Sequence, residues 1–293
     1  MQIEYKNQKI EKVCTVASYA EKKYGVEMAE KISQYLESRG CICHMPERME
    51  KADGDHTGYR YTDSGMVPEN VECVITLGGD GTLIQAARDL AGRQIPMLGI
   101  NMGTLGYLTQ ISGQEAITPR LAELVSDQFQ LEHRMMLKGT VVRHGKVIAK
   151  ELALNEIVVA RREMLRLLRL NIRVNGEFLI QYHADGVIVG TPTGSTGYNL
   201  SAGGPIVEPT ARMTILTPIS AHSLNGRSVV LSSEDQIEIE VMGHVQDGQS
   251  AVFDGDSYVT LEVGDRILVE RSEIETILVK LNAGSFLDNL RSK

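Results

Sequence analysis

Short apolar runs alternate with stretches of helical periodicity over the first 130 residues of the chain. Residues 71–77 form a mostly apolar, β-branched run that predicts a buried strand, and residues 83–90 behind it have helical spacing. Residues 95–100 predict a second short strand, and Thr118-Pro119 is typical of the start of a helix that continues past residue 125. This alternation predicts an α/β domain with a doubly wound, mostly parallel sheet.

The segment before residue 70 is less regular. Residues 11–39 place apolar positions at helical spacing and end at Gly40, which predicts a helix over this range. Residues 41–70 are polar and rich in Asp, Gly and His, so we expect a long loop that serves as a lid or as a spacer.

Near residue 130 the pattern changes to alternation of apolar and polar positions. Residues 168–174 alternate in this way and run into Asn175-Gly176, which predicts a strand entering a tight hairpin. Residues 237–241 and 259–263 alternate similarly. We therefore expect an all-β region over residues 131–270, and the same pattern also suits a single mixed sheet.

The length of 293 residues permits one large domain or two moderate ones. The change of period divides the chain into an α/β domain over residues 1–130 and a β-rich domain over residues 131–270. Residues 277–290 carry apolar side chains that suit docking, so we expect the C-terminal segment 271–293 to return to the first domain.

Composition excludes some classes of function. The chain is 42% hydrophobic and 23% charged, as ordinary globular proteins are, and its net charge of −8 argues against nucleic acid as a partner. No run approaches the roughly 18 apolar residues of a membrane span, and the N-terminus lacks the apolar core of a signal peptide. The four cysteines have no zinc-site spacing, so we expect reduced thiols and a cytoplasmic protein.

The glycine-rich run Gly78-Gly-Asp-Gly-Thr82 lies between the strand predicted at 71–77 and the helix behind it. Glycines let the backbone approach a ligand, and a helix N-terminus favours anionic groups such as phosphates. A carboxylate at Asp80 would repel a phosphate, so it is better suited to a hydroxyl proton or a metal ion. The run therefore suggests phosphoryl transfer to an alcohol, and the alternative is an ordinary tight connection.

Two further segments carry polar groups in apolar surroundings. An apolar strand before residue 190 leads into the turn Thr191-Pro-Thr-Gly-Ser-Thr-Gly-Tyr198, whose hydroxyls and backbone amides suit sugars, amides or phosphates. Asn155-Glu156 interrupts an otherwise apolar strand. The alternatives are a surface loop for the first segment and an exposed strand edge for the second.

Taken together, these motifs resemble the NAD kinase family over roughly residues 70–260. The Gly-Gly-Asp-Gly-Thr run is shared with lipid kinases and is similar to a run of phosphofructokinases, whereas the Thr-Pro-Thr-Gly-Ser-Thr run is far more specific. The matching motifs are Gly78-Gly-Asp-Gly-Thr82, Gly99-Ile-Asn-Met-Gly-Thr-Leu-Gly-Tyr107, Asn155-Glu156, Asp185-Gly186, Thr191-Pro-Thr-Gly-Ser-Thr-Gly-Tyr198, Leu216-Thr-Pro-Ile219 and His222-Ser-Leu224.

The resemblance implies transfer of the terminal phosphoryl group of ATP to the 2′-hydroxyl of the adenosine ribose of NAD, giving NADP. It implies a divalent cation, expected to be Mg²⁺, small-molecule partners only, and a homo-oligomer. Asp80 would be the general base, and the β-rich domain would bind NAD. The residues implied to contact NAD are Asp80, Gly81, Tyr107, Asn155, Glu156, Arg166, His183, Asp185, Thr196, Gly197, Tyr198, Asn199, Leu200, Ser201 and Asp256.

The chain departs from the family pattern at two of these positions. Gly197 stands where alanine is usual, which should loosen the loop slightly. Asp256 stands where glutamine is usual, so an amide donor is replaced by a charge and that contact is in doubt. A lipid kinase and a non-catalytic NAD(P) sensor are the alternative functions; the first leaves the Thr-Pro-Thr-Gly-Ser-Thr run unexplained, and the second does not require a base at Asp80.

Overall fold

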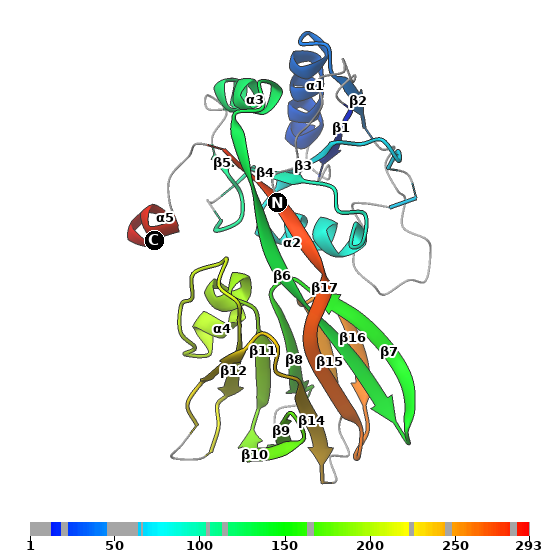
Figure 1. Cartoon of the computed structure of the whole chain (residues 1–293), viewed down its shortest axis with the longest axis vertical. Coiled ribbons are helices and arrows are strands. Elements are labelled where there is room, and N and C mark those ends of the chain that lie inside the picture. The colour runs from blue at the N-terminus through cyan, green and yellow to red at the C-terminus, as the bar shows by residue number, and fades with distance from the viewer. Residues whose placement is uncertain are drawn as a thin grey trace.

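Parallel strands and helices occupy one end of the molecule and antiparallel strands the other (Figure 1). The computed structural model describes residues 13–18, 23–45, 64–65, 67–103, 106–112, 117–162, 167–222, 226–243, 248–281 and 286–292. The strands of the first end pair in parallel, in the order β4-β3-β1-β2, with β5 beside β4. These elements are β1 (Val13–Ser18), α1 (Lys23–Glu37), β2 (Ile42–His44), β3 (Cys73–Gly78), α2 (Asp80–Asp89), β4 (Met97–Asn101), β5 (Ile111–Ser112) and α3 (Ile117–Val125).

The helix predicted over residues 11–39 is wrong in its first part. Residues Val13–Ser18 form strand β1, which pairs with β2 on one side and β3 on the other, and α1 begins only at Lys23. Periodicity cannot distinguish a short buried strand from a helical turn when most positions are apolar. Pairing with β3, about 60 residues further along the chain, decides the conformation.

The loop predicted over residues 41–70 also needs correction. Ile42–His44 form strand β2, at the edge of the parallel sheet. Residues 46–63 and 66, which make up most of the predicted loop, lie outside the described residues. The proposed role of this segment as a lid or spacer therefore stays a prediction.

The antiparallel end is built from strands β6 to β16. It contains β6 (Phe129–Arg143), β7 (Lys146–Ala153), β8 (Glu156–Arg161), β9 (Leu168–Val174), β10 (Glu177–Ala184), β11 (Gly186–Gly190), β12 (Met213–Ile219), β13 (Val229–Ser232), β14 (Ile237–Met242), β15 (Gln249–Phe253) and β16 (Ser257–Leu261). Six of these strands form a separate sheet in the order β13-β12-β11-β8-β15-β16. The hairpin predicted at Asn175-Gly176 is confirmed: it joins β9 to β10, and both residues have positive φ, as a tight hairpin turn requires.

Two short helical elements interrupt the β-rich region, which is therefore not all-β. The 3-10 helix η2 (Thr193–Thr196) and the single turn α4 (Tyr198–Ser201) follow β11 directly. Both lie in the hydroxyl- and glycine-rich segment, where the strand pattern stops.

Strand β17 (Arg266–Leu281) joins the two ends of the molecule. It pairs antiparallel with β14 and β6, and further along with β4 in parallel, where Leu278 lies opposite Met97. Together with β6 it runs from the β-rich end into the α/β end (Figure 1). Among the described residues, the first sheet is consequently mixed and has eleven strands, and α5 (Phe286–Ser292) follows β17 in the chain. The boundaries 1–130, 131–270 and 271–293 stay predictions.

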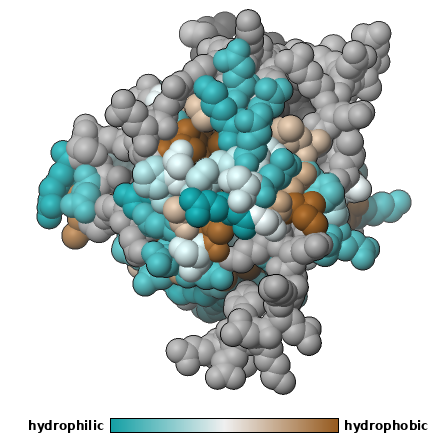
Figure 2. All heavy atoms as spheres, turned by 90° about the horizontal axis from the view of Figure 1, so that it is seen from above, coloured by the Kyte–Doolittle hydropathy of each residue, from teal (hydrophilic) through white to brown (hydrophobic). Residues whose placement is uncertain are grey.

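Aliphatic side chains dominate the buried core. The cluster in the β-rich region lies between the two sheets and includes Tyr182 and Phe253, which are the largest fully buried side chains. Two further clusters cover the opposite faces of the parallel strands, one under α1 and α3 and one under α2. Figure 2 looks onto the α1 and α3 end, where hydrophobic areas are small and lie among hydrophilic residues. Among the described residues, no helix is long and apolar enough to cross a membrane.

Candidate functional site

Asp80 is the first residue of α2, immediately behind strand β3. Gly79 precedes it in extended conformation and caps the helix without a side-chain hydrogen bond. A carboxylate in the first turn is stabilised by the helix dipole. A Cβ at Gly78 would lie 2.2 Å from Thr82 Oγ1, whereas a Cβ at Gly81 would meet open space. The turn is thus tightly packed on one side of Asp80 and open at Gly81.

The loop that follows β4 wraps around the Asp80 carboxylate. Backbone amides donate to it from Tyr107 at 2.6 Å, Leu108 at 3.1 Å and Thr109 at 3.3 Å. A Cβ at Gly106 would lie 1.9 Å from Asp80 Oδ1, so only glycine lets the loop come this close. Because β3 and β4 are parallel neighbours, their carboxyl ends meet at one edge of the sheet. The structure therefore brings the Tyr107 backbone amide to Asp80, and the expected contact of the Tyr107 side chain with NAD stays a prediction.

Asn155 and Glu156 lie at the turn between β7 and β8. The carboxylate of Asp254 accepts hydrogen bonds from the backbone amides of Leu154 at 2.7 Å, Asn155 at 2.8 Å and Glu156 at 3.0 Å. The Asp254 amide donates in return to the Glu156 carbonyl at 3.0 Å. Asp254 thus shapes the turn that carries Asn155 and Glu156, and it was not among the predicted site residues although the Asp254-Gly255 turn marks its position.

Asn155 and Glu156 each keep a buried polar atom without a hydrogen-bond partner, Oδ1 of Asn155 and Oε2 of Glu156. Glu156 is 8% exposed, so it is not on an exposed strand edge. Burial, and then the charge of Asp254, raises the pKa of Glu156 to about 8. Buried polar atoms without partners in the protein are positions where a ligand can supply them.

The segment over residues 191–197 packs directly against this turn. The Thr191 hydroxyl donates to the Leu154 carbonyl at 2.6 Å. A Cβ at Gly194 would lie 2.2 Å from the Asn155 carbonyl oxygen, and one at Gly197 would lie 3.3 Å from Glu156 Oε2. Gly194 is thus needed for the close approach. At Gly197 an added methyl group would be in tight contact with Glu156, and the loosening expected there stays a prediction.

Asn199 lies in α4 and is fully buried. Its Nδ2 donates to the carbonyls of Ser195 at 3.1 Å and Pro205 at 3.0 Å, and its Oδ1 accepts from the Thr217 hydroxyl at 2.7 Å. These contacts fold the loop onto β12. The remaining predicted residues of this segment are partly or fully exposed: Thr196, Tyr198, Leu200 and Ser201.

Asp185 lies at the opposite end of the second sheet from Glu156, and His183 lies two residues before it in β10 of the first sheet. In the antiparallel register of β11 and β8, Gly190 pairs with Glu156 and Gly186 with Ala160, so Asp185 is about 17 Å from Glu156 along the strand. Asp185 Oδ1 forms an ion pair with Arg161 Nη2 at 2.7 Å, a partner that the sequence reasoning missed. The structure therefore does not bring Asp185 to the Asn155 turn.

Some parts of the predicted site lie outside the described residues. These are Arg166, and, within the matched motifs, residues 104–105 and 223–224. Their predicted roles stay predictions.

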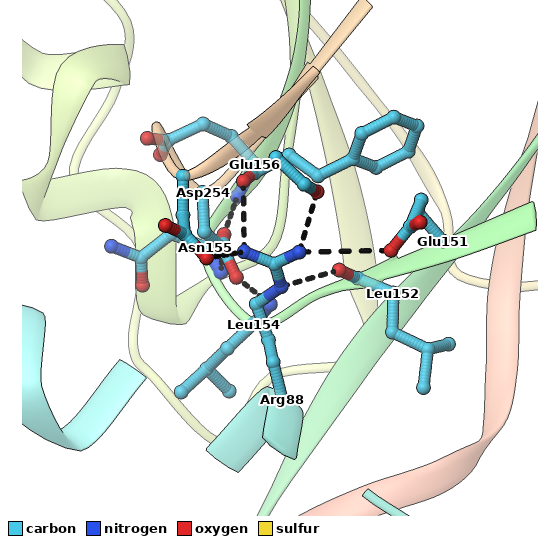
Figure 3. Close-up of polar contacts among 10 residues, drawn as sticks. Arg88, Glu151, Leu152, Leu154, Asn155, Glu156 and Asp254 are labelled. Atoms are coloured by element: carbon cyan, nitrogen blue, oxygen red, sulfur yellow. Dashed lines mark hydrogen bonds and ion pairs between the residues drawn. The ribbon is translucent and has the colours of Figure 1, made fainter. Parts of the chain in front are cut away.

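Arg88, in the last turn of α2, forms a polar network that the sequence did not predict (Figure 3). Its side chain is 10% exposed and donates to the carbonyls of Leu152 at 3.1 Å and Phe253 at 3.2 Å, and to the Ser257 hydroxyl at 2.6 Å. It also donates to Asp256 Oδ2 at 3.0 Å. The negative charge of Asp256 is the reason that its contact with NAD is in doubt. In the structure this charge is paired with the guanidinium of Arg88.

A cavity of about 380 Å³ lies beside Arg88 and contains none of the predicted site residues. Its lining combines three cations with two carboxylates: Arg88, Asp89, Ala91, Lys138, Lys150, Glu151 and Leu152. The described part of the chain holds no group of three or more His, Cys, Asp or Glu side chains that could bind a metal ion. Side chains of the described residues alone therefore form no site for a resident metal ion.

Comparison with known proteins gives one consistent result. The family model described as the ATP-NAD kinase N-terminal domain matches residues 13–129, and the ATP-NAD kinase C-terminal domain matches residues 154–281. The chain is 44% identical over 275 residues to the NAD kinase of Lachnospira eligens, covering 90% of this chain and 93% of that protein. It is 40% identical over 291 residues to the NAD kinase of Lachnoclostridium phytofermentans, covering 97% and 99%.

Solved structures agree with these relatives. Yeast NADH kinase complexed with NADH superposes with a TM-score of 0.80 at 27% identity, covering 96% of this chain and 85% of that one. An NAD kinase from Archaeoglobus fulgidus in complex with ATP superposes with a TM-score of 0.75 at 27% identity, covering 96% and 97%. The α/β plus β-rich fold class predicted from the sequence is thereby confirmed.

Proposed function

The chain belongs to the ATP-NAD kinase family, and we propose that it transfers the terminal phosphoryl group of ATP to the 2′-hydroxyl of the adenosine ribose of NAD, with Asp80 as the general base. The observation that carries this proposal is the Asp80 carboxylate, held at the N-terminus of α2 by three backbone amides. Membership of this family favours NAD kinase over the lipid kinase and sensor alternatives.

The amides of the Tyr107 to Thr109 loop would hold the base in position during the reaction. Two of the amides and the Thr109 hydroxyl donate to Oδ1, whereas the Tyr107 amide donates to Oδ2, so Oδ2 keeps an acceptor position for one substrate hydroxyl. The 2′-hydroxyl would lose its proton to Asp80 as its oxygen attacks the terminal phosphorus, and the bond from that phosphorus to the bridging oxygen of ADP breaks. A divalent cation, expected to be Mg²⁺, would arrive bound to the ATP phosphates and neutralise their charge.

The turn at Asn155 and Glu156 would hold NAD. Each residue presents a buried oxygen without a protein partner, and a ligand hydroxyl or amide can donate to it. With its pKa near 8, Glu156 carries a proton at neutral pH and can also donate a hydrogen bond. The remaining residues implied by the family resemblance, the homo-oligomer and the cytoplasmic location stay proposals.

The test of this function is NADP formation from NAD, ATP and Mg²⁺ by the purified protein beside Asp80→Asn. We expect wild type to form NADP and the variant to lose roughly 10²- to 10⁴-fold in kcat, as removal of a general base does. Asparagine keeps one oxygen acceptor but places an N–H₂ group against backbone donors, so the melting temperature and NAD affinity of the variant are measured as controls. Turnover near the wild-type level in a folded variant would contradict the role of Asp80.

A further inference from the structure

Helix α2 carries Asp80 at one end and Arg88 at the other. It spans ten residues, Asp80–Asp89, so the two Cα atoms are separated by about 12 Å along a rigid axis. Whatever Arg88 contacts is therefore held at a set distance from Asp80.

The Arg88 guanidinium contacts both chain segments that lead to the Asn155 turn. The Leu152 carbonyl that it binds lies at the end of β7, and the Phe253 carbonyl lies at the end of β15. Asp256 and Ser257 belong to the turn that follows β15 and to the start of β16. Figure 3 shows the guanidinium between these segments. Glu151 adds a longer ion pair at 3.7 Å.

Asp254 continues the connection from Arg88 to the turn. It directly follows Phe253 in the chain, and its carboxylate accepts the three consecutive backbone amides of residues 154–156. Its backbone has a φ of +50°, a conformation that non-glycine residues adopt rarely and that needs support from neighbouring structure. Arg88 supplies that support by binding the carbonyl on one side of Asp254 and the carboxylate of Asp256 on the other.

We propose that Arg88 is a positioning residue that sets the spacing between the Asp80 end of α2 and the Asn155–Glu156 turn. This role rests on the proposed function, in which Asp80 accepts the hydroxyl proton and the turn holds NAD. In this role, the polar network in Figure 3 aligns the base with its substrate. A misplacement of about 1 Å at a residue far from the chemistry can cost roughly a hundredfold in rate, so alignment of this kind is measurable in turnover.

Arg93 provides a matched control on the same side of the fold. Its guanidinium binds three backbone carbonyls, where that of Arg88 binds two: those of Ser64 at 2.8 Å, Val67 at 2.5 Å and Pro68 at 2.6 Å. These contacts hold the segment before β3 and do not involve the Asn155 turn. Lysine in place of either arginine keeps the charge and loses the planar fork that reaches several acceptors.

The experiment compares wild type, Arg88→Lys and Arg93→Lys at a temperature well below all three melting points. We expect Arg88→Lys to lower kcat/KM for NAD by roughly tenfold to a hundredfold, with weaker NAD binding by calorimetry in the absence of ATP. Arg93→Lys should stay within about twofold of wild type, although both variants lower the melting temperature.

A second arm tests whether Arg88 acts through Asp254. If it does, Arg88→Lys combined with Asp254→Asn should lower kcat/KM for NAD by clearly less than the product of the two single effects. Multiplicative effects would overturn this connection. An Arg88→Lys variant that keeps wild-type kcat and KM while wild type forms NADP would overturn the role of Arg88 alone. Failure of wild type to form NADP would instead overturn the proposed function.

Discussion

Glu156 is a buried carboxyl group whose surroundings favour its neutral form. It is 8% exposed, its Oε2 has no hydrogen-bond partner, and the Asp254 carboxylate lies nearby. Burial also raises the pKa of Asp254, against the effect of its three backbone hydrogen bonds and of Arg88. Two carboxyl groups in one buried site therefore compete for ionisation, and the proton is kept most readily where the hydrogen bonds are missing, on Glu156.

This arrangement predicts a pH dependence of stability. Because the pKa of Glu156 is raised from 4.5 to about 8, its contribution to the free energy of unfolding is full below pH 4.5 and is lost as the pH rises through 8. Between about pH 5 and about pH 9 we expect wild type to lose on the order of a few kcal/mol more than Glu156→Gln. Urea denaturation of both proteins across this range measures the difference.

The comparison with Glu156→Gln controls for the remaining titratable groups, because wild type and variant share them. The difference curve belongs to the coupled pair of Glu156 and Asp254, because each affects the other. Parallel curves for the two proteins would show that Glu156 does not change its protonation over this range.

At the scale of elements, the site depends on how closely two connections approach each other. The turn between β7 and β8 and the η2 segment meet with no room for a side chain at Gly194, where an added Cβ would lie 2.2 Å from a backbone oxygen. At Gly197 the nearest atoms are Glu156 Oε2 and the Gly194 carbonyl oxygen, both at 3.3 Å. Neither glycine has a positive φ, so space and not backbone conformation distinguishes them.

This difference predicts opposite tolerance at two glycines three residues apart. Gly194→Ala should lower the free energy of unfolding by about 1–3 kcal/mol, because backbone must move to relieve the overlap. Gly197→Ala should cost less than about 1 kcal/mol and change KM for NAD only slightly, because contacts at 3.3 Å are relieved by much smaller shifts than an overlap at 2.2 Å. Chemical denaturation and steady-state kinetics of the two variants test this, and equal losses of stability would contradict it.

At the scale of the whole molecule, long strands couple the two ends. Arg134 lies on β6, which continues from the β-rich end to the α/β end, and its side chain is 7% exposed. It donates to Glu132 Oε1 at 2.6 Å and to the Thr193 hydroxyl of η2 at 3.3 Å. Lys280 of β17 contacts the other Glu132 oxygen at 3.0 Å. One buried arginine thus ties the loop of the site to the strands that connect both ends.

Removing this arginine should affect the whole fold. Arg134→Met leaves Glu132 with the partly exposed Lys280 as its cationic partner, so the loss should be about 1–3 kcal/mol, below the cost of a buried charge left without any partner. Lys280→Met should cost less than about 1 kcal/mol, because its side chain is 38% exposed and such pairs contribute little. Denaturant midpoints of the two variants provide the comparison, and an Arg134→Met midpoint equal to wild type would contradict the coupling.

Local pattern was sufficient for much of this protein. The junction of a strand and a helix within Gly78–Thr82, the Asn175-Gly176 hairpin and the alternation in β9 and β14 depend on neighbours in the chain, and the structure contains all three. The helix begins at Asp80, three residues before the predicted start at residue 83. The family resemblance rested on motifs of this local kind, and the comparisons confirm it. A sequence determines such features by itself because their geometry is set by the residues within a few positions.

Contacts between distant residues were decided only by the tertiary structure. Strand β1 exists because β2 and β3 flank it, and the separation of Asp185 from Glu156 follows from the register of β8 and β11. Arg88 reaches carbonyls 64 and 165 positions away, and Asp254 reaches amides about 100 positions away. No local periodicity encodes these pairs, because their energies arise only once packing has removed water and brought the segments into contact.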